Sequence, residues 1–196
     1  MKKLYLYIFL VLIWCNVGFT EDISELQIEG VSIGDSLLDH YSKKKILKKT
    51  LYEKEQGNNK DVGFVYLEGN EENFENYRRI KIGYKTNDQY FKIILITGFV
   101  NINKDINKCI IKKREITKDL KNIFNNHDFE VSGWRQHAFD ATSRTNSSII
   151  YFSKNSNYDS FVRVICYDWS KESGYNDQLR VELVSSEYYE WLSSLK

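Results

Sequence analysis

The chain has 196 residues, of which 28 are basic and 27 acidic, and its formal net charge is +1. So little excess positive charge gives no indication of the strongly basic face on which nucleic-acid binding depends, so we expect no nucleic-acid partner. Proline is absent altogether, which argues against proline-rich linkers. The length suits one domain with a sizeable core.

The first 20 residues have the pattern of a secretory signal peptide. Two lysines precede an apolar run at 4–15, and small residues at 18 and 20 precede a cleavage site. We therefore expect an exported protein, periplasmic or secreted, with a single domain at 21–196 and a net charge of −1 once Lys2 and Lys3 are removed. The alternative is a retained N-terminal anchor, in which case this segment is the expected contact with a membrane.

The Gly-Asp-Ser-Leu block at 34–37 resembles the nucleophile segment of the GDSL esterases, and Gly-Tyr-Asn-Asp at 174–177 resembles a second block of that family. The resemblance implies Ser36 as nucleophile, which needs a histidine base further along the chain. No histidine follows Asp177. The same residues fit a helix start in which Ser32 is the cap and Asp35 reaches back to the Ser32 amide. We favour the cap, and keep a serine esterase using Ser36 as the alternative.

The first half of the chain predicts strands and short helices. We expect a strand at 23–29, helical segments at 35–40 and 43–54, and strands at 62–67, 77–85 and 89–100. In the strand at 77–85, Ile80, Ile82 and Tyr84 alternate with charged residues, which is typical of a half-buried antiparallel strand. The strand at 89–100 is apolar on both faces, so we expect both of its faces to be covered.

The second half begins with the clearest helix, predicted at about 104–125. Lys108, Lys112, Lys118 and Lys121 fall outside its apolar stripe, so that stripe can pack on a sheet. Strands are expected at 134–142, 147–153, 160–169 and 179–184, and a short helix closes the chain. The stripe consists of Ile106, Cys109, Ile110, Ile116, Leu120, Ile123 and Phe124.

Two cysteines remain once the signal segment with its Cys15 is removed. Cys109 lies on the helical stripe and Cys166 in a predicted strand, so a helix lying on the sheet would bring the two sulfurs together. In an oxidising compartment the expected outcome is a disulfide, worth about 4 kcal/mol in the chain-entropy model. The alternative is two separate buried thiols.

These elements predict an α+β fold. We expect a mostly antiparallel sheet of about six or seven strands packed against the helix at 104–125, with short N-terminal and C-terminal helices. That arrangement differs from the parallel sheet on which a GDSL esterase presents its serine.

Three further segments are similar to blocks of small exported proteins of unknown function from Pelagibacter-type marine alphaproteobacteria. They are Ile-Glu-Gly-Val-Ser-Ile-Gly-Asp-Ser-Leu-Leu-Asp at 28–39, Asn-Lys-Cys at 107–109 and Arg-Val-Ile-Cys-Tyr-Asp-Trp-Ser-Lys-Glu at 163–172. The resemblance implies an exported protein and no particular reaction. This chain departs from the family after Ser42, where three lysines replace acidic residues and are unfavourable at a helix start.

The other candidate sites have simpler interpretations. His137 and Asp140 are three residues apart in a predicted strand, which would point them to opposite faces. No phosphate loop, zinc spacing or calcium loop is present, so we expect no metal and no cofactor. The sequence therefore predicts a non-catalytic binding or interaction domain of unknown ligand and partner. Most of the aromatic residues are expected in the core. Those that are also candidates for a ligand cleft are Trp134, Trp169, Tyr175, Tyr188, Tyr189 and Trp191.

Overall fold

The computed structural model describes residues 22–53, 56–100, 102, 105–138, 140–152 and 160–195. The predicted signal segment at 1–20 lies outside the described residues. Within those ranges, no helix is both long enough and apolar enough to cross a membrane.

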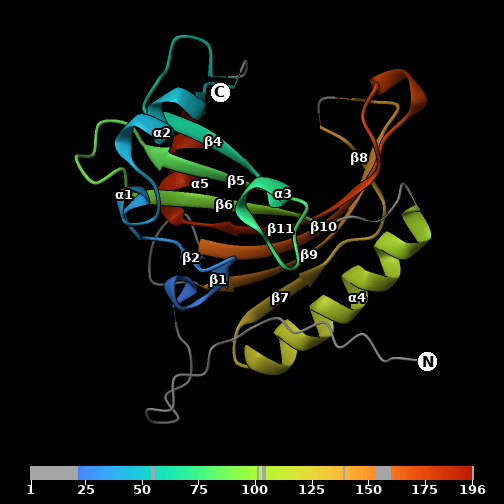
Figure 1. Ribbon diagram of the computed structural model, residues 1–196. Helices are drawn as coiled ribbons and strands as arrows, with labels where there is room; N and C mark the ends of the chain where they lie inside the picture. The colour runs from blue at the N-terminus through green and yellow to red at the C-terminus, as the bar shows by residue number, and fades with distance from the viewer. Residues whose placement is uncertain are drawn as a thin grey trace.

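An antiparallel sheet of nine strands forms the centre of the fold, and a separate two-stranded hairpin lies against it (Figure 1). The strands are β1 (Gln27–Ile28), β2 (Val31–Ser32), β3 (Thr50–Leu51), β4 (Val62–Glu68), β5 (Arg79–Lys85), β6 (Ile93–Val100), β7 (Asp128–Val131), β8 (Arg135–Gln136), β9 (Arg144–Phe152), β10 (Ser160–Asp168) and β11 (Gln178–Val184). The order in the large sheet is β3-β4-β5-β6-β11-β10-β9-β7, and β8 pairs with β9 off this path. The hairpin consists of β1 and β2.

The predicted α+β class and the mostly antiparallel sheet are confirmed, and the predicted strand count of six or seven is wrong. The strands of the large sheet that the sequence pattern misses, β3 and β7, are two and four residues long and lie at the sheet edges. Alternation over so few residues gives no recognisable period. Short edge strands of this kind are therefore visible only in the structure.

Two predicted strands are interrupted by turns. The segment at 23–29 becomes a 3-10 turn at Ile23–Glu25 followed by β1, and Glu29 and Gly30 then reverse the chain at φ 52° and 79°. The segment at 134–142 keeps only β8, because Asp140 closes a turn by accepting hydrogen bonds from the Thr142 N–H and the Ser143 hydroxyl.

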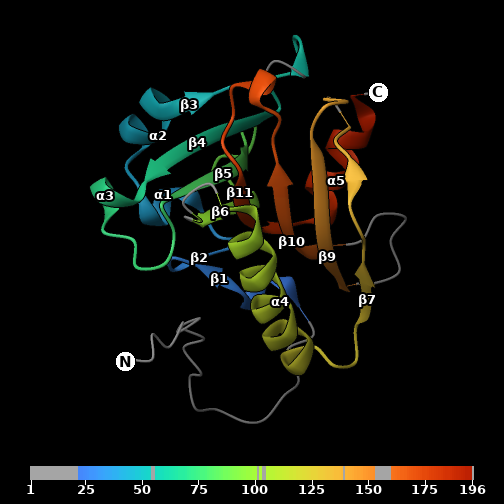
Figure 2. The same cartoon turned by 90° about the vertical axis from the view of Figure 1, so that its right-hand side faces the viewer.

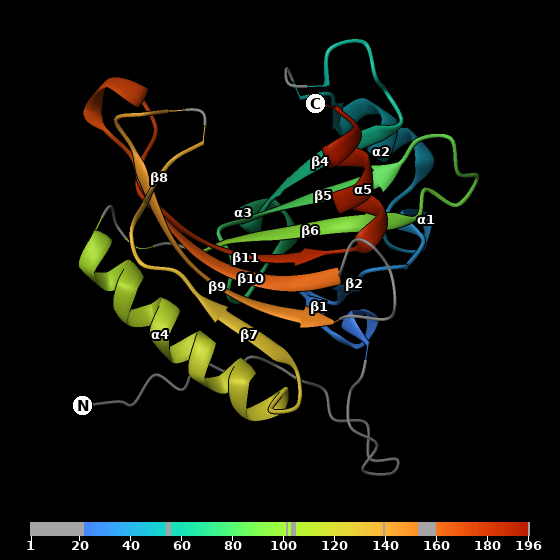
Figure 3. The ribbon, with the colours of Figure 1, turned by 180° about the vertical axis from the view of Figure 1, so that it is seen from behind.

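Helices cover both faces of the sheet. The long helix α4 (Ile106–Ile123) crosses one face, and the C-terminal α5 (Ser186–Ser194) covers part of the other (Figures 2 and 3). One core cluster packs beneath α4 and the N-terminal segments, and a second packs beneath α5 around Phe64 and Tyr188. The predicted long helix and the short terminal helices are confirmed. The remaining helices are α1 (Leu37–His40), α2 (Lys43–Lys49) and α3 (Gly69–Glu72).

The helix predicted at 43–54 ends early, at Lys49. Ser42 begins it by accepting a hydrogen bond from the Lys45 N–H at 3.4 Å, so the chain starts a helix here despite its three lysines. Thr50 then turns to extended geometry and pairs with β4. Its hydroxyl bonds the Ile46 carbonyl and the Tyr84 hydroxyl, each at 2.8 Å, which fixes the change from helix to strand.

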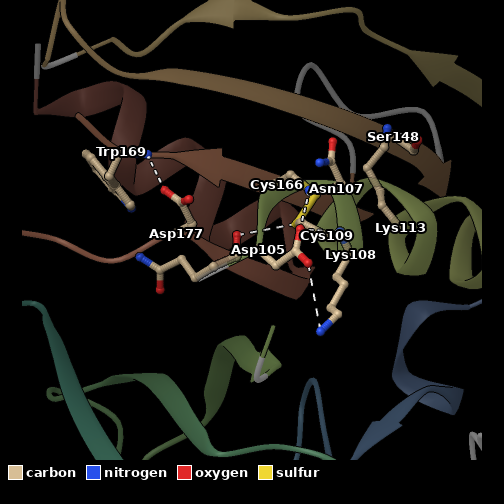
Figure 4. The surroundings of a disulfide bond; sticks show 10 residues. Asp105, Asn107, Lys108, Cys109, Lys113, Ser148, Cys166, Trp169 and Asp177 are labelled. Atoms are coloured by element: carbon tan, nitrogen blue, oxygen red, sulfur yellow. Dashed lines mark hydrogen bonds and ion pairs between the residues drawn. A yellow bond between two sulfur atoms is a disulfide. The ribbon is translucent and has the colours of Figure 1, made fainter. Parts of the chain in front are cut away.

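The predicted disulfide is confirmed. Cys109 in the first turn of α4 and Cys166 in β10 are bonded, with their Cα atoms 5.9 Å apart (Figure 4). Asp105 caps α4 by accepting hydrogen bonds from the Asn107 and Lys108 N–H groups. Both the cap and the disulfide therefore fix the N-terminal end of α4 on the sheet.

Candidate functional site

Ser36, the candidate nucleophile, is the residue that caps α1. Its hydroxyl accepts a hydrogen bond from the Leu38 N–H at 3.2 Å and donates one to the Tyr90 carbonyl at 2.7 Å. His40, in the same short helix, pairs with Asp35 at 3.4 Å. The arrangement is that of a helix start tied to the loop before β6.

The prediction that Ser32 caps this helix is wrong. Ser32 lies in β2, where its N–H donates to the Asp35 carboxylate at 2.9 Å, so half of the expected capping box is present. Gly34, at φ 93°, turns the chain after β2 and delays the helix until Leu37. The capping role therefore passes to Ser36.

The two segments that resemble esterase blocks lie at opposite ends of β6. Ser36 bridges to Lys92, just before β6 begins, whereas the loop at 174–177 leads into β11, whose Leu179 pairs with Val100 at the end of β6. Eight strand residues separate these ends, about 25 Å at 3.3 Å per residue. The loop has its own local role, since the Asp177 carboxylate accepts from the Trp169 N–H at 2.9 Å (Figure 4).

His137 and Asp140 occupy a turn rather than a strand. Hydrogen bonds from Ser143 and Thr142 lower the pKa of Asp140 to about 2, and this carboxylate closes the turn. Burial lowers the pKa of His137, whose ring lies 4.6 Å from the Trp169 ring. No group of three or more potential metal ligands occurs among the described residues.

The aromatic residues considered for a single cleft fall into separate groups. Trp169 packs against Tyr175, with ring centroids 4.9 Å apart, near the loop at 174–177. Tyr188 and Trp191 instead pack on Phe64 beneath α5. The structure therefore does not bring these side chains together into one ligand cleft.

An apolar pocket of about 330 Å³, which sequence patterns did not indicate, lies between the β1–β2 hairpin, α4 and the sheet. We call it the apolar pocket. Its walls come from segments far apart in the chain, so no local motif marks it. Residues that form its apolar wall include Leu26, Ile28, Ile116, Leu120, Val162 and Leu183.

Polar groups stand around the same pocket. The Glu29 carboxylate accepts hydrogen bonds from the Glu75 and Asn76 N–H groups, at 3.2 and 3.0 Å, and so joins the hairpin to the loop after α3. Burial raises the pKa of the neighbouring Tyr77 above its ordinary value, so its hydroxyl keeps its proton further into the alkaline range. Lys112 lies half-buried in the lining, and its ammonium group makes no hydrogen bond or ion pair with any described residue.

Lys112 was predicted to lie outside the apolar stripe of α4. In the structure it borders the apolar pocket, because the hairpin rises beside the helix and extends the apolar surface past the stripe. A cation beside an apolar wall can hold the anionic end of an amphiphilic molecule whose other end is buried.

Comparisons with protein-family models, with curated proteins and with solved structures find no match for this chain. The similarity to small exported proteins of marine alphaproteobacteria therefore stays a prediction from the sequence.

Proposed function

We propose that this protein is an exported, non-catalytic binding domain whose apolar pocket takes a small amphiphilic molecule. The single observation that carries the proposal is the pocket of about 330 Å³ with an apolar wall and, in its lining, Lys112, whose ammonium group has no partner among the described residues. Small-molecule sites usually have this composition, a mostly apolar wall with a few polar groups that orient the ligand. The disulfide supports the exported setting, because such bonds persist in oxidising compartments.

The energetics favour a ligand with a hydrocarbon body and a carboxylate. Each buried methylene contributes about 0.8 kcal/mol, so a short chain inside the pocket supplies most of the affinity. The carboxylate would remain near the rim, where an ion pair with Lys112 adds specificity more than affinity. The near balance of basic and acidic residues supports a small-molecule ligand over nucleic acid.

Titration of the purified protein with dodecanoic acid and with dodecanol, followed by calorimetry, tests this proposal. Ile116→Phe should fill the pocket and weaken binding of both probes by at least tenfold. Ile123→Phe is the matched control, because Ile123 lies on the same helix but does not line the pocket. Lys112→Met should weaken the binding of dodecanoic acid several-fold and leave the affinity for dodecanol unchanged. Equal binding by the two phenylalanine variants, or no binding of either probe by the unaltered protein, would overturn the proposal.

A further inference from the structure

The buried stripe of α4 contains a lysine in the middle of apolar positions. Cys109, Lys113, Ile116 and Leu120 are the buried residues of this helix, and Lys113 is only 4% exposed. Its Nζ donates one hydrogen bond, to the Ser148 hydroxyl of β9 at 2.9 Å, one helical turn beyond the disulfide (Figure 4). It makes no ion pair with any described residue.

Burying such a lysine costs free energy. An ammonium group carries three donors, and a single neutral hydroxyl compensates little of the hydration that it loses. Burial, together with the nearby Arg114, lowers the pKa of Lys113 to about 8. Natural interiors rarely leave a charge unpaired unless a ligand or a function compensates it.

Lys113 lines a second pocket, of about 370 Å³, between α4 and strands β7 and β9, which we call the basic pocket. Arg114, Lys118 and Lys121 line it as well, and no acidic side chain does so among the described residues. This flank of α4 faces away from the β1–β2 hairpin (Figure 2). The basic pocket is therefore separate from the apolar pocket, although the two share one helix.

Neutral hydrogen-bonding groups complete the lining. Thr117 lies one turn after Lys113, and its hydroxyl oxygen is buried without a hydrogen-bond partner among the described residues. Ser148 accepts from Lys113, which leaves its own proton available. The side chain of Asn146 in β9 also lines the pocket and makes no hydrogen bond with any described residue. Buried polar groups normally have partners, so a hydroxyl without a described partner, beside a lysine without a described counter-ion, points to a ligand that bonds both.

We infer that the basic pocket binds a small tetrahedral oxyanion, a phosphate or sulfate group, either free or as part of a small molecule. Several cations and hydroxyl donors surround one space from both the helix and the strands, which suits an anion with several oxygens and more than one negative charge. The oxyanion would neutralise Lys113 and bond the Thr117 hydroxyl. Arg114, Lys118 and Lys121 at the rim would attract it from solvent.

The direct test is titration of the full chain, free of phosphate and sulfate, with inorganic phosphate, inorganic sulfate and glycerol 3-phosphate at constant ionic strength. Binding is followed by calorimetry and by the chemical shift of the Lys113 ammonium group. Saturable binding of inorganic phosphate or sulfate indicates a free-ion site. Binding of glycerol 3-phosphate at least tenfold more tightly than inorganic phosphate indicates a phosphoester site. Both results support the inference.

Lys113→Met should weaken phosphate binding at least tenfold, and the nearly isosteric Thr117→Val should weaken it several-fold. Lys112→Met is the matched control: it removes the adjacent lysine, which lines the apolar pocket, and should leave phosphate affinity unchanged. Because Thr117→Val removes no charge, it distinguishes a built site from general attraction to a basic helix. Equal loss in Lys112→Met and Lys113→Met, binding only to anionic vesicles, or no saturable binding of any probe would each overturn the inference.

Discussion

Arg163 and Glu182 lie opposite each other on neighbouring strands, and the Arg163 Nε donates to the Glu182 carboxylate at 2.6 Å. The carboxylate is almost completely buried, at 5% exposure of the residue, on the face of the sheet that α5 partly covers. Arg180 and Lys81 line the same region. A charge held this deeply depends on its partner, because water is not available to replace it.

Glu182→Gln should therefore be strongly destabilising. The change leaves the Arg163 guanidinium without its counter-ion, which costs about 3 kcal/mol in buried pairs. Denaturant unfolding followed by circular dichroism measures the loss. Glu68→Gln is the control, because Glu68 forms an exposed pair with Arg79 at 3.7 Å and should cost about 0.5 kcal/mol or less. Similar losses in the two variants would contradict the assigned role of the buried pair.

The same pair predicts a loss of stability in acid. Burial by itself would raise the pKa of Glu182, but the positive charges of Arg163 and Arg180 more than offset it, and the pKa is lowered. A carboxyl group with a lowered folded-state pKa stabilises the protein above its unfolded value, about 4.3, and this contribution is lost as the pH falls further. The difference in unfolding free energy between the unaltered protein and Glu182→Gln should thus shrink below about pH 4. A difference that stays constant with pH would exclude this linkage.

Removing the disulfide should lower the free energy of unfolding by about 4 kcal/mol. The bond joins residues 57 positions apart, and without it the unfolded chain regains the entropy of that loop. The double variant Cys109→Ser/Cys166→Ser measures the effect in urea. Intact mass after alkylation, with and without reductant, should show two thiols only after reduction. Alkylation of both cysteines without reductant would contradict the bond.

Ser36→Ala should cost about 1 kcal/mol, because it removes the cap of α1 and the hydrogen bond to Tyr90. Ser32→Ala should be nearly neutral, since the Ser32 bond to Asp35 comes from its backbone N–H. Thermal unfolding of both variants measures the difference, and the melting temperature should fall in Ser36→Ala and stay nearly unchanged in Ser32→Ala. A nitrophenyl butyrate assay addresses the esterase alternative: we expect no hydrolysis, and turnover that disappears in Ser36→Ala would establish Ser36 as a nucleophile.

Lys113 predicts a rise in stability with pH in phosphate-free buffer. Its folded pKa, about 8, lies below the ordinary value of 10.5, so between these values the unfolded chain binds more protons and unfolding becomes harder as the pH rises. Arg114, Lys118 and Lys121 face the pocket from α4, whereas its lining residues from β7 and β9 do not titrate in this range. Relative to Lys113→Met, the unaltered protein should gain stability from pH 8 to pH 10. If the unfolding free energies of the two proteins changed with pH in parallel, Lys113 would have its ordinary pKa.

The parts of the fold that follow from sequence are those with a long local pattern. Ile80, Ile82 and Tyr84 repeat every second residue and identify β5, and the stripe of α4 places Cys109 over the sheet. The C-terminal end of α2 could not be predicted from the sequence, because Thr50 leaves the helix through a contact with Tyr84, which lies far along the chain. Local preference decides an element only where no distant contact competes with it.

The pockets were beyond sequence reasoning for a related reason, since each is assembled from segments that meet only after folding. One signal was available: position 113 is four residues after Cys109 and three before Ile116, so a helix necessarily places Lys113 on the buried side. A charged residue inside a regular apolar period marks a place to look for a ligand or partner. Its neighbours across the pocket, Ser148 and Asn146, carry no such signal.

The order of strands also determines when the sheet can be completed. β11 is the last strand along the chain, yet it lies between β6 and β10, with Glu182 opposite Thr97. The strands β4, β5 and β6 can pair with their neighbours in sequence, as can β9 and β10. Among the described strands, β11 is the one that pairs with both halves of the sheet. Pairings between distant residues form slowly. We therefore expect the pairing of β6 with β11, which joins residues far apart in the chain, to form later than the pairings between consecutive strands.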